Sequence, residues 1–590
     1  MSTTFGEAWF LELAGCLDEV RETAATSAKV GRLARYLATL SDDDLRRACT
    51  FLAGRPFPPG DGRRLGMGWA AIAQVLRDLT RVPEAEMHAA YRAHGDLGDT
   101  AAILLARYPP AAGLFASRIT LERIERDFVA IAAAQGQASR RAKSAALADL
   151  LGRASPREAA YLIKIMTSDM RIGLREGLLL PAIAAAFGRD AATVRQGALL
   201  IAEPGEIAVR ARAGTLDRVS LVPGRPFRFM LASPLDAPAD AFDDRTPVLW
   251  VEDKYDGIRV QAHRTPDGVV MLSRTLDNVT AAFPEIPPAL ASRDGAYIVD
   301  GEVVAWQNDR ALAFGRLQQR LQRRNPGALV GEIPVVLVAF DLVHLDGRDL
   351  LGAPLTERRA ALEALRLPPP VRLSTASEAA TAADLAQRFA EARAAGNEGI
   401  VMKRPDAPYQ PGRRGRLWTK WKPGVGTLDV VVVAAEYGHG KRAGVLSDYT
   451  FAVRDGSRLA TIGKAYSGLT DAEIKELTAW FLAHTRQDLG FMRTVDPEVV
   501  LEVAFDAITR SDRHDSGFAL RFPRIVRIRG DKPPEEINTL DDVRELFARL
   551  TSHAAGPAAG IHAVDDGAMP PESDAGRRCS RTDNGNFGQN

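Results

Sequence analysis

The spacing of apolar residues changes between residues 215 and 247, and this change constrains the fold more than any other feature of the chain. Before it, apolar residues recur every three or four positions, as in amphipathic helices. The segments with this spacing are Phe5–Glu22, Val30–Leu40, Trp69–Leu79 and Thr120–Ala134. Ser41, followed by three aspartates, predicts a further helix start, because a serine hydroxyl caps free backbone N–H groups. We therefore predict an all-α domain over residues 1–215.

From Pro247 onward, short apolar strands alternate with turns. β-branched residues, which suit a pleated sheet, are frequent in Val248–Val251, Val269–Ser273, Tyr297–Trp306 and Val335–Val343. Helical spacing returns at Thr356–Leu365 and Ala382–Ala395. The alternation predicts an α/β domain over residues 247–424. An irregular, proline-containing linker over residues 216–246 would join it to the helical domain.

A third region follows Pro423-Gly424. It contains five candidate strands, at Val430–Tyr437, Ser447–Arg454, Leu459–Tyr466, Val499–Ala507 and Phe522–Ile528. Five short strands are the number in a small OB-fold barrel, so we expect a β-barrel domain over residues 425–550. Residues 551–590 are rich in Gly, Ala, Pro, Ser, Asp and Asn, a composition that predicts a disordered tail.

The composition excludes several classes of protein. Of the 590 residues, 46% are apolar and 26% are charged, as in ordinary globular proteins. No apolar run is long enough for a membrane span, and the first twelve residues lack the features of a signal peptide. Three cysteines cannot build a disulfide framework or a four-cysteine zinc site. We therefore expect a cytoplasmic protein without a membrane partner.

The basic residues are unevenly distributed in position and in kind. The net charge is only +1, yet residues 118–175 hold eleven Lys and Arg against six Asp and Glu, a local excess that favours a polyanionic partner. The chain has 65 arginines and only 11 lysines. Arginine replaces lysine on a solvated surface but cannot supply a neutral amine, so each retained lysine is informative.

Lys254 lies in Trp250–Arg259, between a strand and a glycine turn, with carboxylates and Arg259 close in sequence. Alone, it would be interpreted as a solvated turn lysine. However, further lysines occur in motif-like clusters, namely Lys403, Lys420, Lys422 and Lys532. Two lysines separated by one residue on a strand share a face, and nearby cations favour a neutral, nucleophilic amine.

Seven short motifs follow one another along the chain: Lys254-Tyr255-Asp256-Gly257, Ser273-Arg274-Thr275, Asp300-Gly301-Glu302, Phe340-Asp341-Leu342, Glu398-Gly399, Trp418–Lys422 and Arg521–Lys532. In kind and in order they resemble the motifs of the ATP-dependent DNA ligases. Met170-Arg171-Ile172-Gly173-Leu174 resembles a signature of the helical DNA-binding domain of three-domain ligases. The chain thus resembles a bacterial three-domain ligase over residues 1–550. This resemblance implies a multidomain fold with a DNA-binding domain, an adenylation domain and an OB-fold domain.

The resemblance also implies a three-step reaction and the residues that carry it. Lys254 would attack the α-phosphorus of ATP and become lysyl-AMP, AMP would pass to the 5′-phosphate of nicked double-stranded DNA, and the 3′-hydroxyl would displace it. Glu252 would contact the adenine amino group, Phe340 would stack on the base, and Arg259, Arg274 and Glu302 would contact the ribose or nick phosphate. Glu398, together with Glu302, would bind Mg²⁺, with Mn²⁺ as the alternative metal. Arg414, Lys420 and Lys422 would neutralise the triphosphate, and Arg521, Arg524, Arg527, Asp531 and Lys532 would orient pyrophosphate.

Other interpretations are open at this stage. Phe340 could be a core residue, Trp418 and Trp421 packing residues, and Arg521–Arg529 a solvated strand face. Gly438–Arg442 is interpreted first as a hairpin loop and second as a phosphate contact. An RNA ligase or a capping guanylyltransferase would leave the helical domain unexplained, and an NAD-dependent ligase would need a zinc module. A non-catalytic DNA-binding protein with a degenerate core would not be expected to retain the motif lysines. We expect a monomeric DNA ligase used in repair rather than replication.

Overall fold

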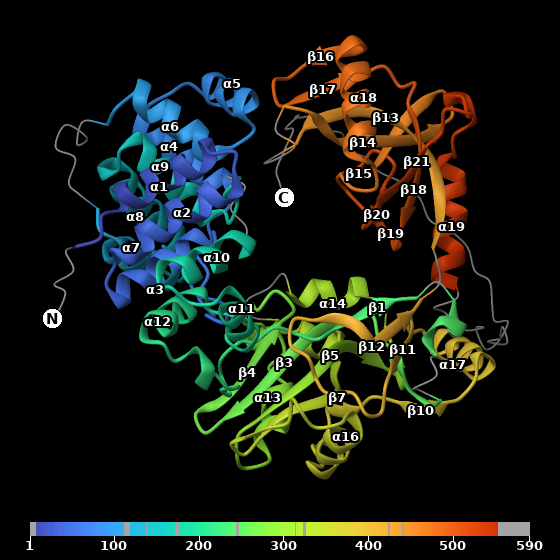
Figure 1. Ribbon diagram of the computed structural model, residues 1–590. Coiled ribbons are helices and arrows are strands. Elements are labelled where there is room, and N and C mark those ends of the chain that lie inside the picture. The colour runs from blue at the N-terminus through green and yellow to red at the C-terminus, as the bar shows by residue number, and fades with distance from the viewer. Residues whose placement is uncertain are drawn as a thin grey trace, which may run out of the picture.

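The computed structural model describes residues 7–110, 119–136, 138–171, 176–235, 237–242, 247–312, 314–321, 326–422, 425–438, 442 and 444–552. The predicted tail after residue 552, residues 172–174 of the helical signature, 439–441 of the predicted loop and the boundary at 423–424 lie outside this set. In Figure 1 the chain forms three domains, with the helical domain and the β-barrel domain both standing on the central α/β domain.

The helical domain surrounds one core. Its described helices are α1 (Phe10–Glu22), α2 (Thr26–Ala38), α3 (Asp42–Leu52), α4 (Trp69–Thr80), α5 (Glu84–His94), α6 (Leu97–Arg107), α7 (Leu121–Ala133), α8 (Ser139–Arg153), α9 (Pro156–Met166), α10 (Glu176–Ala186), α11 (Ala191–Leu200) and α12 (Pro204–Ala213). Ser41 caps α3 as predicted, because its hydroxyl accepts a hydrogen bond of 3.2 Å from the Asp44 N–H. Phe10, Leu17, Phe51 and Phe128 are buried in the shared core, which makes the all-α prediction correct.

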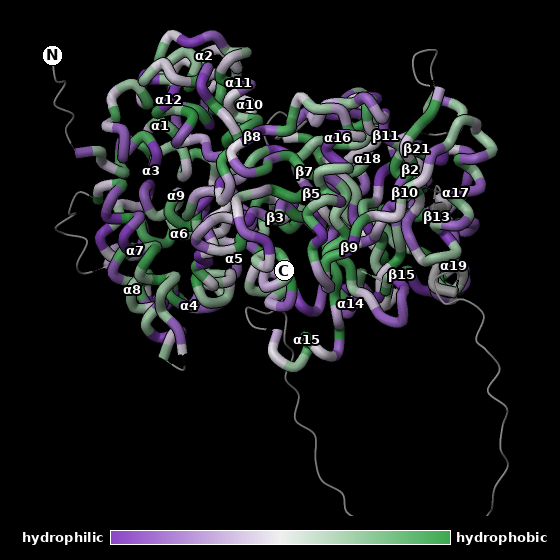
Figure 2. The backbone as a smooth tube through the Cα atoms, turned by 90° about the horizontal axis from the view of Figure 1, so that it is seen from below, coloured by the Kyte–Doolittle hydropathy of each residue, from purple (hydrophilic) through white to green (hydrophobic). Residues whose placement is uncertain are grey.

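The central domain contains two sheets. The first has the order β1-β12-β11-β2-β10 and the second β4-β3-β5-β7-β8, with β6 beside β5 and β9 beside β7. The strands are β1 (Leu231–Pro234), β2 (Leu249–Lys254), β3 (Ile258–Thr265), β4 (Gly268–Ser273), β5 (Tyr297–Gln307), β6 (Arg310–Ala311), β7 (Val335–Leu345), β8 (Arg348–Asp349), β9 (Val371–Leu373), β10 (Ala376–Ala379), β11 (Gly399–Lys403) and β12 (Arg414–Trp421). Figure 2 shows hydrophobic stretches along β3, β5 and β7, whose side chains form the core of the second sheet.

Helices cover these sheets: α13 (Ile286–Ala291), α14 (Phe314–Leu321), α15 (Leu329–Glu332), α16 (Leu355–Ala364) and α17 (Ala382–Ala394). The central sheet begins earlier in the chain than we expected. Strand β1 lies inside the predicted linker and pairs in parallel with β12. It has four residues and ends in proline, so it carries little of the alternating pattern that reveals longer strands.

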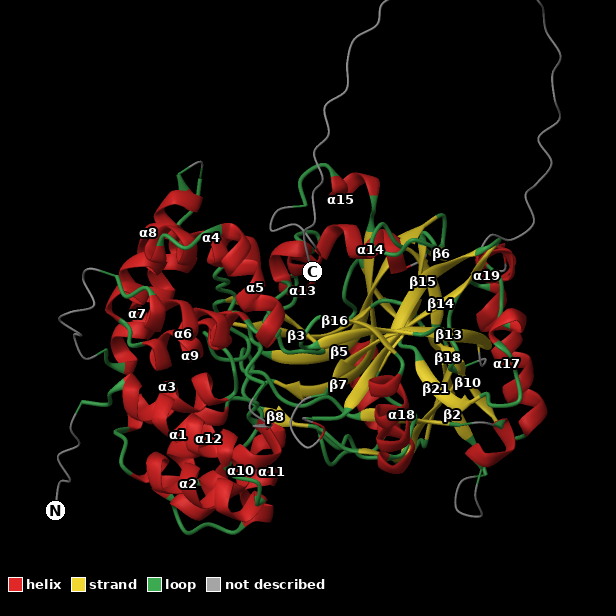
Figure 3. Cartoon of the chain, turned by 90° about the horizontal axis from the view of Figure 1, so that it is seen from above, coloured by secondary structure: helices red, strands yellow, loops and turns green. Residues whose placement is uncertain are grey.

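The third domain is a β-barrel flanked by α18 (Asp471–Ala483) and α19 (Leu540–Ser552). The five predicted strands correspond to β13 (Val425–Tyr437), β14 (Leu446–Asp455), β15 (Arg458–Ala465), β18 (Val500–Phe505) and β21 (Arg524–Ile528). Four shorter strands add to them: β16 (Thr485–Asp488), β17 (Met492–Val495), β19 (Ala507–Arg510) and β20 (Phe518–Arg521). In Figure 3 the helical domain lies on one side of the molecule, and the two strand-rich domains lie on the other.

Both outer domains contact the central one. From the helical domain, the Gly60 N–H donates to the Leu276 carbonyl at 2.8 Å. From the barrel, Asp506 lies 2.6 Å from the Lys422 ammonium. None of the described helices is long and apolar enough to cross a bilayer.

Candidate active site

Three neighbouring strands of the first sheet bring the predicted residues together. Val401 on β11 is paired with Glu252 on β2 on one side and with Lys420 on β12 on the other. Lys254 lies two residues beyond Glu252, so both side chains point to the same face of the sheet. The sheet register therefore places the Lys254 amine, the Glu252 carboxylate and the Lys420 amine on the wall of one cavity of about 690 Å³, a volume typical of small-molecule sites (about 300–1,000 Å³).

Two glycines allow the close approach on which this site depends. A Cβ at Gly257 would lie 2.3 Å from the Val303 carbonyl oxygen, so only glycine lets the turn after Lys254 rest against β5. At Gly399 a Cβ would lie 2.3 Å from the Trp421 carbonyl oxygen, and φ is +152°. Larger side chains at either position would push the lysine strand away from its neighbours.

Carboxylates surround the Lys254 amine. The Nζ of Lys254 donates to Glu398, which follows α17 and whose backbone N–H donates to the Lys254 carbonyl at 2.7 Å. Burial raises the pKa of Glu302 to about 8, and burial beside Glu398 raises that of Asp256 to about 6. Lys254 and Lys422 hold the pKa of Glu398 below its usual value. A phosphate-bound cation would therefore enter a region that already contains closely spaced acids.

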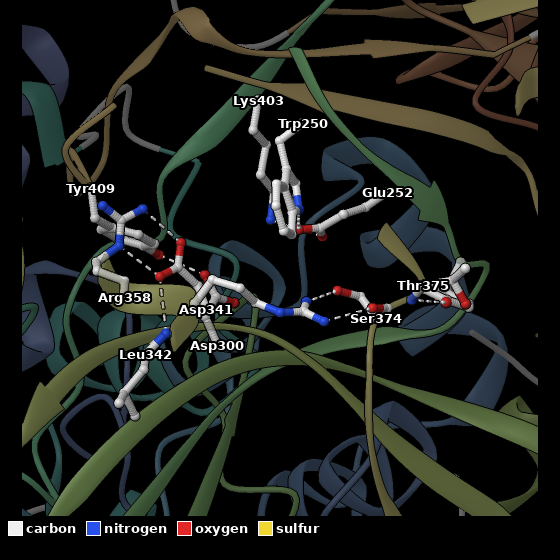
Figure 4. Close-up of polar contacts among 12 residues, drawn as sticks. Trp250, Glu252, Asp300, Asp341, Leu342, Arg358, Ser374, Thr375, Lys403 and Tyr409 are labelled. Atoms are coloured by element: carbon white, nitrogen blue, oxygen red, sulfur yellow. Dashed lines mark hydrogen bonds and ion pairs between the residues drawn. The ribbon is translucent and has the colours of Figure 1, made fainter. Parts of the chain in front are cut away.

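Glu252 is held by two donors inside the domain (Figure 4). The Lys403 ammonium lies 2.9 Å from one carboxylate oxygen, and the Trp250 indole N–H donates to the other at 3.0 Å. The side chains of Glu252 and Lys403 are only 3% and 2% exposed. Lys403 also lies 4.4 Å from the Trp418 ring centre. The pair fixes a carboxylate that retains lone pairs for a further hydrogen bond.

An aromatic wall stands beside this carboxylate. Phe340 is half-buried on β7 and lines the cavity, where its ring packs edge-on against Trp418 with 6.4 Å between ring centres. Arg259 lies 5.5 Å from the Phe340 ring centre and forms an ion pair of 2.7 Å with buried Asp300. The exposed part of Phe340 can therefore stack on a planar ligand while its other side anchors the core.

The opposite rim of the cavity is cationic. Lys420, Arg274 and Arg414 line it, and the Arg414 guanidinium donates to the Ala232 carbonyl at 2.7 Å. Burial, together with nearby Lys254 and Arg414, lowers the pKa of Lys420 to about 8. Such a rim suits a polyphosphate, because a nearby negative charge would favour the protonated form of Lys420 and raise its pKa.

The barrel contributes only part of its predicted set. Arg521 reaches the cavity, 3.7 Å from Asp256 and 4.5 Å from the Phe314 ring centre. Arg524 and Arg527 pair with barrel carboxylates, as does Lys532, which lies 2.8 Å from Asp429. Asp531 binds Arg529. In this arrangement the barrel places Arg521 at the cavity and holds Asp531 and Lys532 against itself.

Several basic residues of the stretch 118–175 are bound to other groups within the helical domain. Lys143 donates to the Leu65 carbonyl at 2.6 Å, and Lys164 lies 2.7 Å from Asp96; both lysines are buried. Other members of the stretch form ion pairs with carboxylates, namely Arg123, Arg153, Arg157 and Arg171. Arg126, Arg140 and Arg141 are exposed.

Two basic residues that line the cavity, Lys403 and Arg64, were not among the predicted site residues. Lys403 belongs to a motif-like cluster, and the scarcity of lysine was the signal that could have placed it in the site. Arg64, from the helical domain, also lines the cavity, and no sequence signal identified it. Within the described ranges, no cluster of three or more His, Cys, Asp or Glu side chains is arranged to bind a metal.

A lysine amine among acids, facing an aromatic wall and a cationic rim, is the arrangement expected of a nucleotidyltransferase that works through an enzyme-bound intermediate. Family models agree with this class. Residues 9–184 match the DNA ligase N terminus, residues 229–422 the ATP dependent DNA ligase domain and residues 442–532 the ATP dependent DNA ligase C terminal region. The chain belongs to the ATP-dependent DNA ligase family, and both the predicted family and the predicted three-domain fold are confirmed.

Individual relatives are similar over nearly the whole chain. A probable DNA ligase of Koribacter versatilis is 43% identical over 560 residues, covering 91% of this chain and 96% of that protein. A DNA ligase of Methanoculleus marisnigri is 36% identical over 544 residues, covering 92% and 98%. A solved structure described as Pmar-Lig_PreS3 has a TM-score of 0.54 at 17% identity, covering 88% of this chain and 99% of that one, and supports the fold alone.

Proposed function

We propose that this chain seals nicks in duplex DNA, with Lys254 as the residue that carries AMP. The supporting observation is the position of the Lys254 amine, in one cavity with the Glu252 carboxylate, the Phe340 ring and the cationic rim. Glu252 would accept a hydrogen bond from the adenine amino group, and Phe340 would stack on the base. Of the alternatives, an RNA ligase or guanylyltransferase is disfavoured by the matched N-terminal ligase region.

In the first step, the Nζ of Lys254 loses a proton and bonds to the α-phosphorus of ATP while the bond to pyrophosphate breaks. Lys420, Arg414 and Arg274 would balance the charge that accumulates on the leaving group. Lys532 and Asp531 are bound within the barrel in the present arrangement, so their contact with pyrophosphate requires the barrel to turn. Domain closure of this kind commonly assembles a site for one step and opens it for the next.

Magnesium fits the acidic side of the site. It is bound by one or two carboxylates together with substrate phosphates, and Glu398 and Glu302 provide two carboxyl groups near Lys254. Burial raises the pKa of Glu302 to about 8 although Lys254 and Arg259 lie nearby, and a further cation at this carboxyl would favour its charged form. Bound there, the metal would neutralise phosphate charge. We extend the proposal to a monomeric, cytoplasmic enzyme that acts in repair.

The test of the AMP carrier is covalent labelling with radioactive nucleotide. The wild-type protein should acquire label from ATP but not from GTP or NAD, and the label should survive denaturing electrophoresis. Lys254→Ala and Lys254→Arg should both remain unlabelled, because guanidinium cannot supply a neutral amine. Lys464→Ala, a barrel lysine outside the cavity, is the matched control and should label normally. Label on either Lys254 variant would contradict the assignment.

A further inference from the structure

The loop that joins α3 to α4 in the helical domain reaches the nucleotide cavity. It follows Leu52 and ends at Trp69. Three contacts dock it on the turn after β4: the Gly60 N–H bond to the Leu276 carbonyl, an Arg55 bond of 3.0 Å to the Thr275 carbonyl, and a 3.6 Å approach of Arg55 to Asp277. The docked turn begins with Thr275, the last residue of the predicted Ser273-Arg274-Thr275 motif, and Thr275 and Asp277 line the cavity, so the helical domain contacts the active site itself.

Arg64 is held between two anchored neighbours. Arg63 forms a bidentate ion pair with Asp61, with a shortest contact of 2.5 Å, and lies 4.7 Å from the Phe57 ring centre. On the other side Leu65 is buried, and its carbonyl accepts the hydrogen bond from buried Lys143. Anchors on both sides fix the backbone of Arg64, which lines the cavity that contains Lys254.

Arg64 also lines a second cavity. This space, of about 650 Å³, is bounded by the loop, by Met166 and Ser168 of the helical domain, and by the docked turn. Arg64, Thr275 and Asp277 line both cavities, so Arg64 stands where they meet. A single nucleotide would occupy the first cavity, whereas a polynucleotide strand with one end there would extend past Arg64 toward the second.

We propose that Arg64 binds a backbone phosphate of the nicked strand next to the break, and thereby couples docking of the helical domain to the two DNA-dependent steps. The proposal rests on the proposed function of the cavity. Guanidinium groups pair strongly with phosphate oxygens, and this one comes from the domain whose family assignment is the ligase N terminus. The ATP phosphates already have a cationic rim from β12 and from Arg274. Arg64 would therefore serve the DNA and not the formation of lysyl-AMP.

The experiment compares Arg64→Gln with Arg153→Gln in the full-length protein. Single-turnover rates are measured for labelling by ATP and for sealing of a pre-adenylated nicked duplex. For Arg64→Gln, sealing should fall by about 10- to 100-fold, the usual cost of a charge-assisted hydrogen bond, and labelling should stay within twofold of wild type. The salt dependence of nick binding should also weaken by about 0.9 in log–log slope. Arg153→Gln, whose guanidinium is bound to Asp149 on the same helix and which lines neither cavity, should leave both rates near wild type.

The contacted phosphate can be located with neutral methylphosphonate linkages placed one at a time around the nick. At one position the substitution should slow the wild type as much as Arg64→Gln does, and should not slow Arg64→Gln further. Equal losses in labelling and sealing would instead place Arg64 on the ATP triphosphate and overturn the proposal. Unchanged sealing by Arg64→Gln would overturn it too. So would a methylphosphonate effect that multiplies with the Arg64→Gln effect at every position tested. Wild-type labelling and sealing test the proposed function separately.

Discussion

Replacing Lys403 by methionine should destabilise the adenylation domain by about 3–5 kcal/mol, the usual cost of removing one partner of a buried ion pair. The magnitude follows from the geometry of the pair. The Lys403 and Glu252 side chains are 2% and 3% exposed and 2.9 Å apart, so solvent screens them little. Without Lys403, the Trp250 indole is the one donor to the Glu252 carboxylate that remains among the described residues. Methionine preserves the contact with Phe340 and Trp418, because thioethers also pack well on rings.

The measurement is thermal unfolding of the full-length protein by tryptophan fluorescence. Four of the seven tryptophans lie in the adenylation domain, at Trp250, Trp306, Trp418 and Trp421, so the signal reports mainly on it. The expected loss corresponds to roughly 6–20 °C in Tm for a domain of this size. Lys464→Met is the control, since Lys464 and Glu436 form an exposed pair worth about 0–1 kcal/mol.

A double variant tests the cause. Lys403→Met combined with Glu252→Met leaves no unpaired charge, and replacing a whole buried pair by apolar side chains is often neutral. The double variant should therefore be more stable than Lys403→Met alone. A loss below about 1 kcal/mol in Lys403→Met, as in an exposed pair, or additive losses in the double variant, would refute the reasoning.

Three further outcomes are expected. Glu302→Gln should raise Tm at neutral pH and should lose this advantage near pH 4.5. Burial raises the pKa of Glu302 in the folded protein from 4.5 to about 8, so the wild type loses stability as pH rises between these two values. An equal change in Tm at both pH values would contradict this explanation. Asp531→Ala with Lys532→Ala should slow labelling by ATP far more than sealing of a pre-adenylated nick, and equal losses would exclude a barrel movement specific to the first step. Arg140→Gln combined with Arg141→Gln should reduce the log–log salt slope of nick binding by about 1.8. Arg153→Gln, whose guanidinium is paired with Asp149, should change this slope little. If the double variant had the slope of the wild type, α8 would not face DNA.

Features set by neighbours in sequence were predictable from the chain alone. The cap at Ser41 depends on residues within one helical turn, and the common face of Glu252 and Lys254 follows from strand periodicity. Other features depend on which strands or domains become neighbours. Lys403 meets Glu252 only because β11 lies beside β2, and Lys532 meets Asp429 across the barrel.

Short elements and docked loops were equally hard to foresee. Strand β1 has four residues, too few to show an alternating pattern, and it is defined by its pairing with β12. Arg64 lies in a loop without periodicity, and its position depends on the docking of Gly60 and Arg55 on another domain. Such placements follow from tertiary contacts, which a local pattern does not encode.

The lowered pKa of Lys420 has a consequence for chemical labelling. An amine with a pKa of about 8 is substantially uncharged in mildly alkaline buffer, and uncharged amines react with acylating reagents. In a chain with eleven lysines, of which Lys143, Lys164 and Lys403 are buried, such a reagent should acylate Lys420 early, and nucleotide in the cavity should shield it. A mass-spectrometric footprint of this one side chain would then report the occupancy of the site without any DNA.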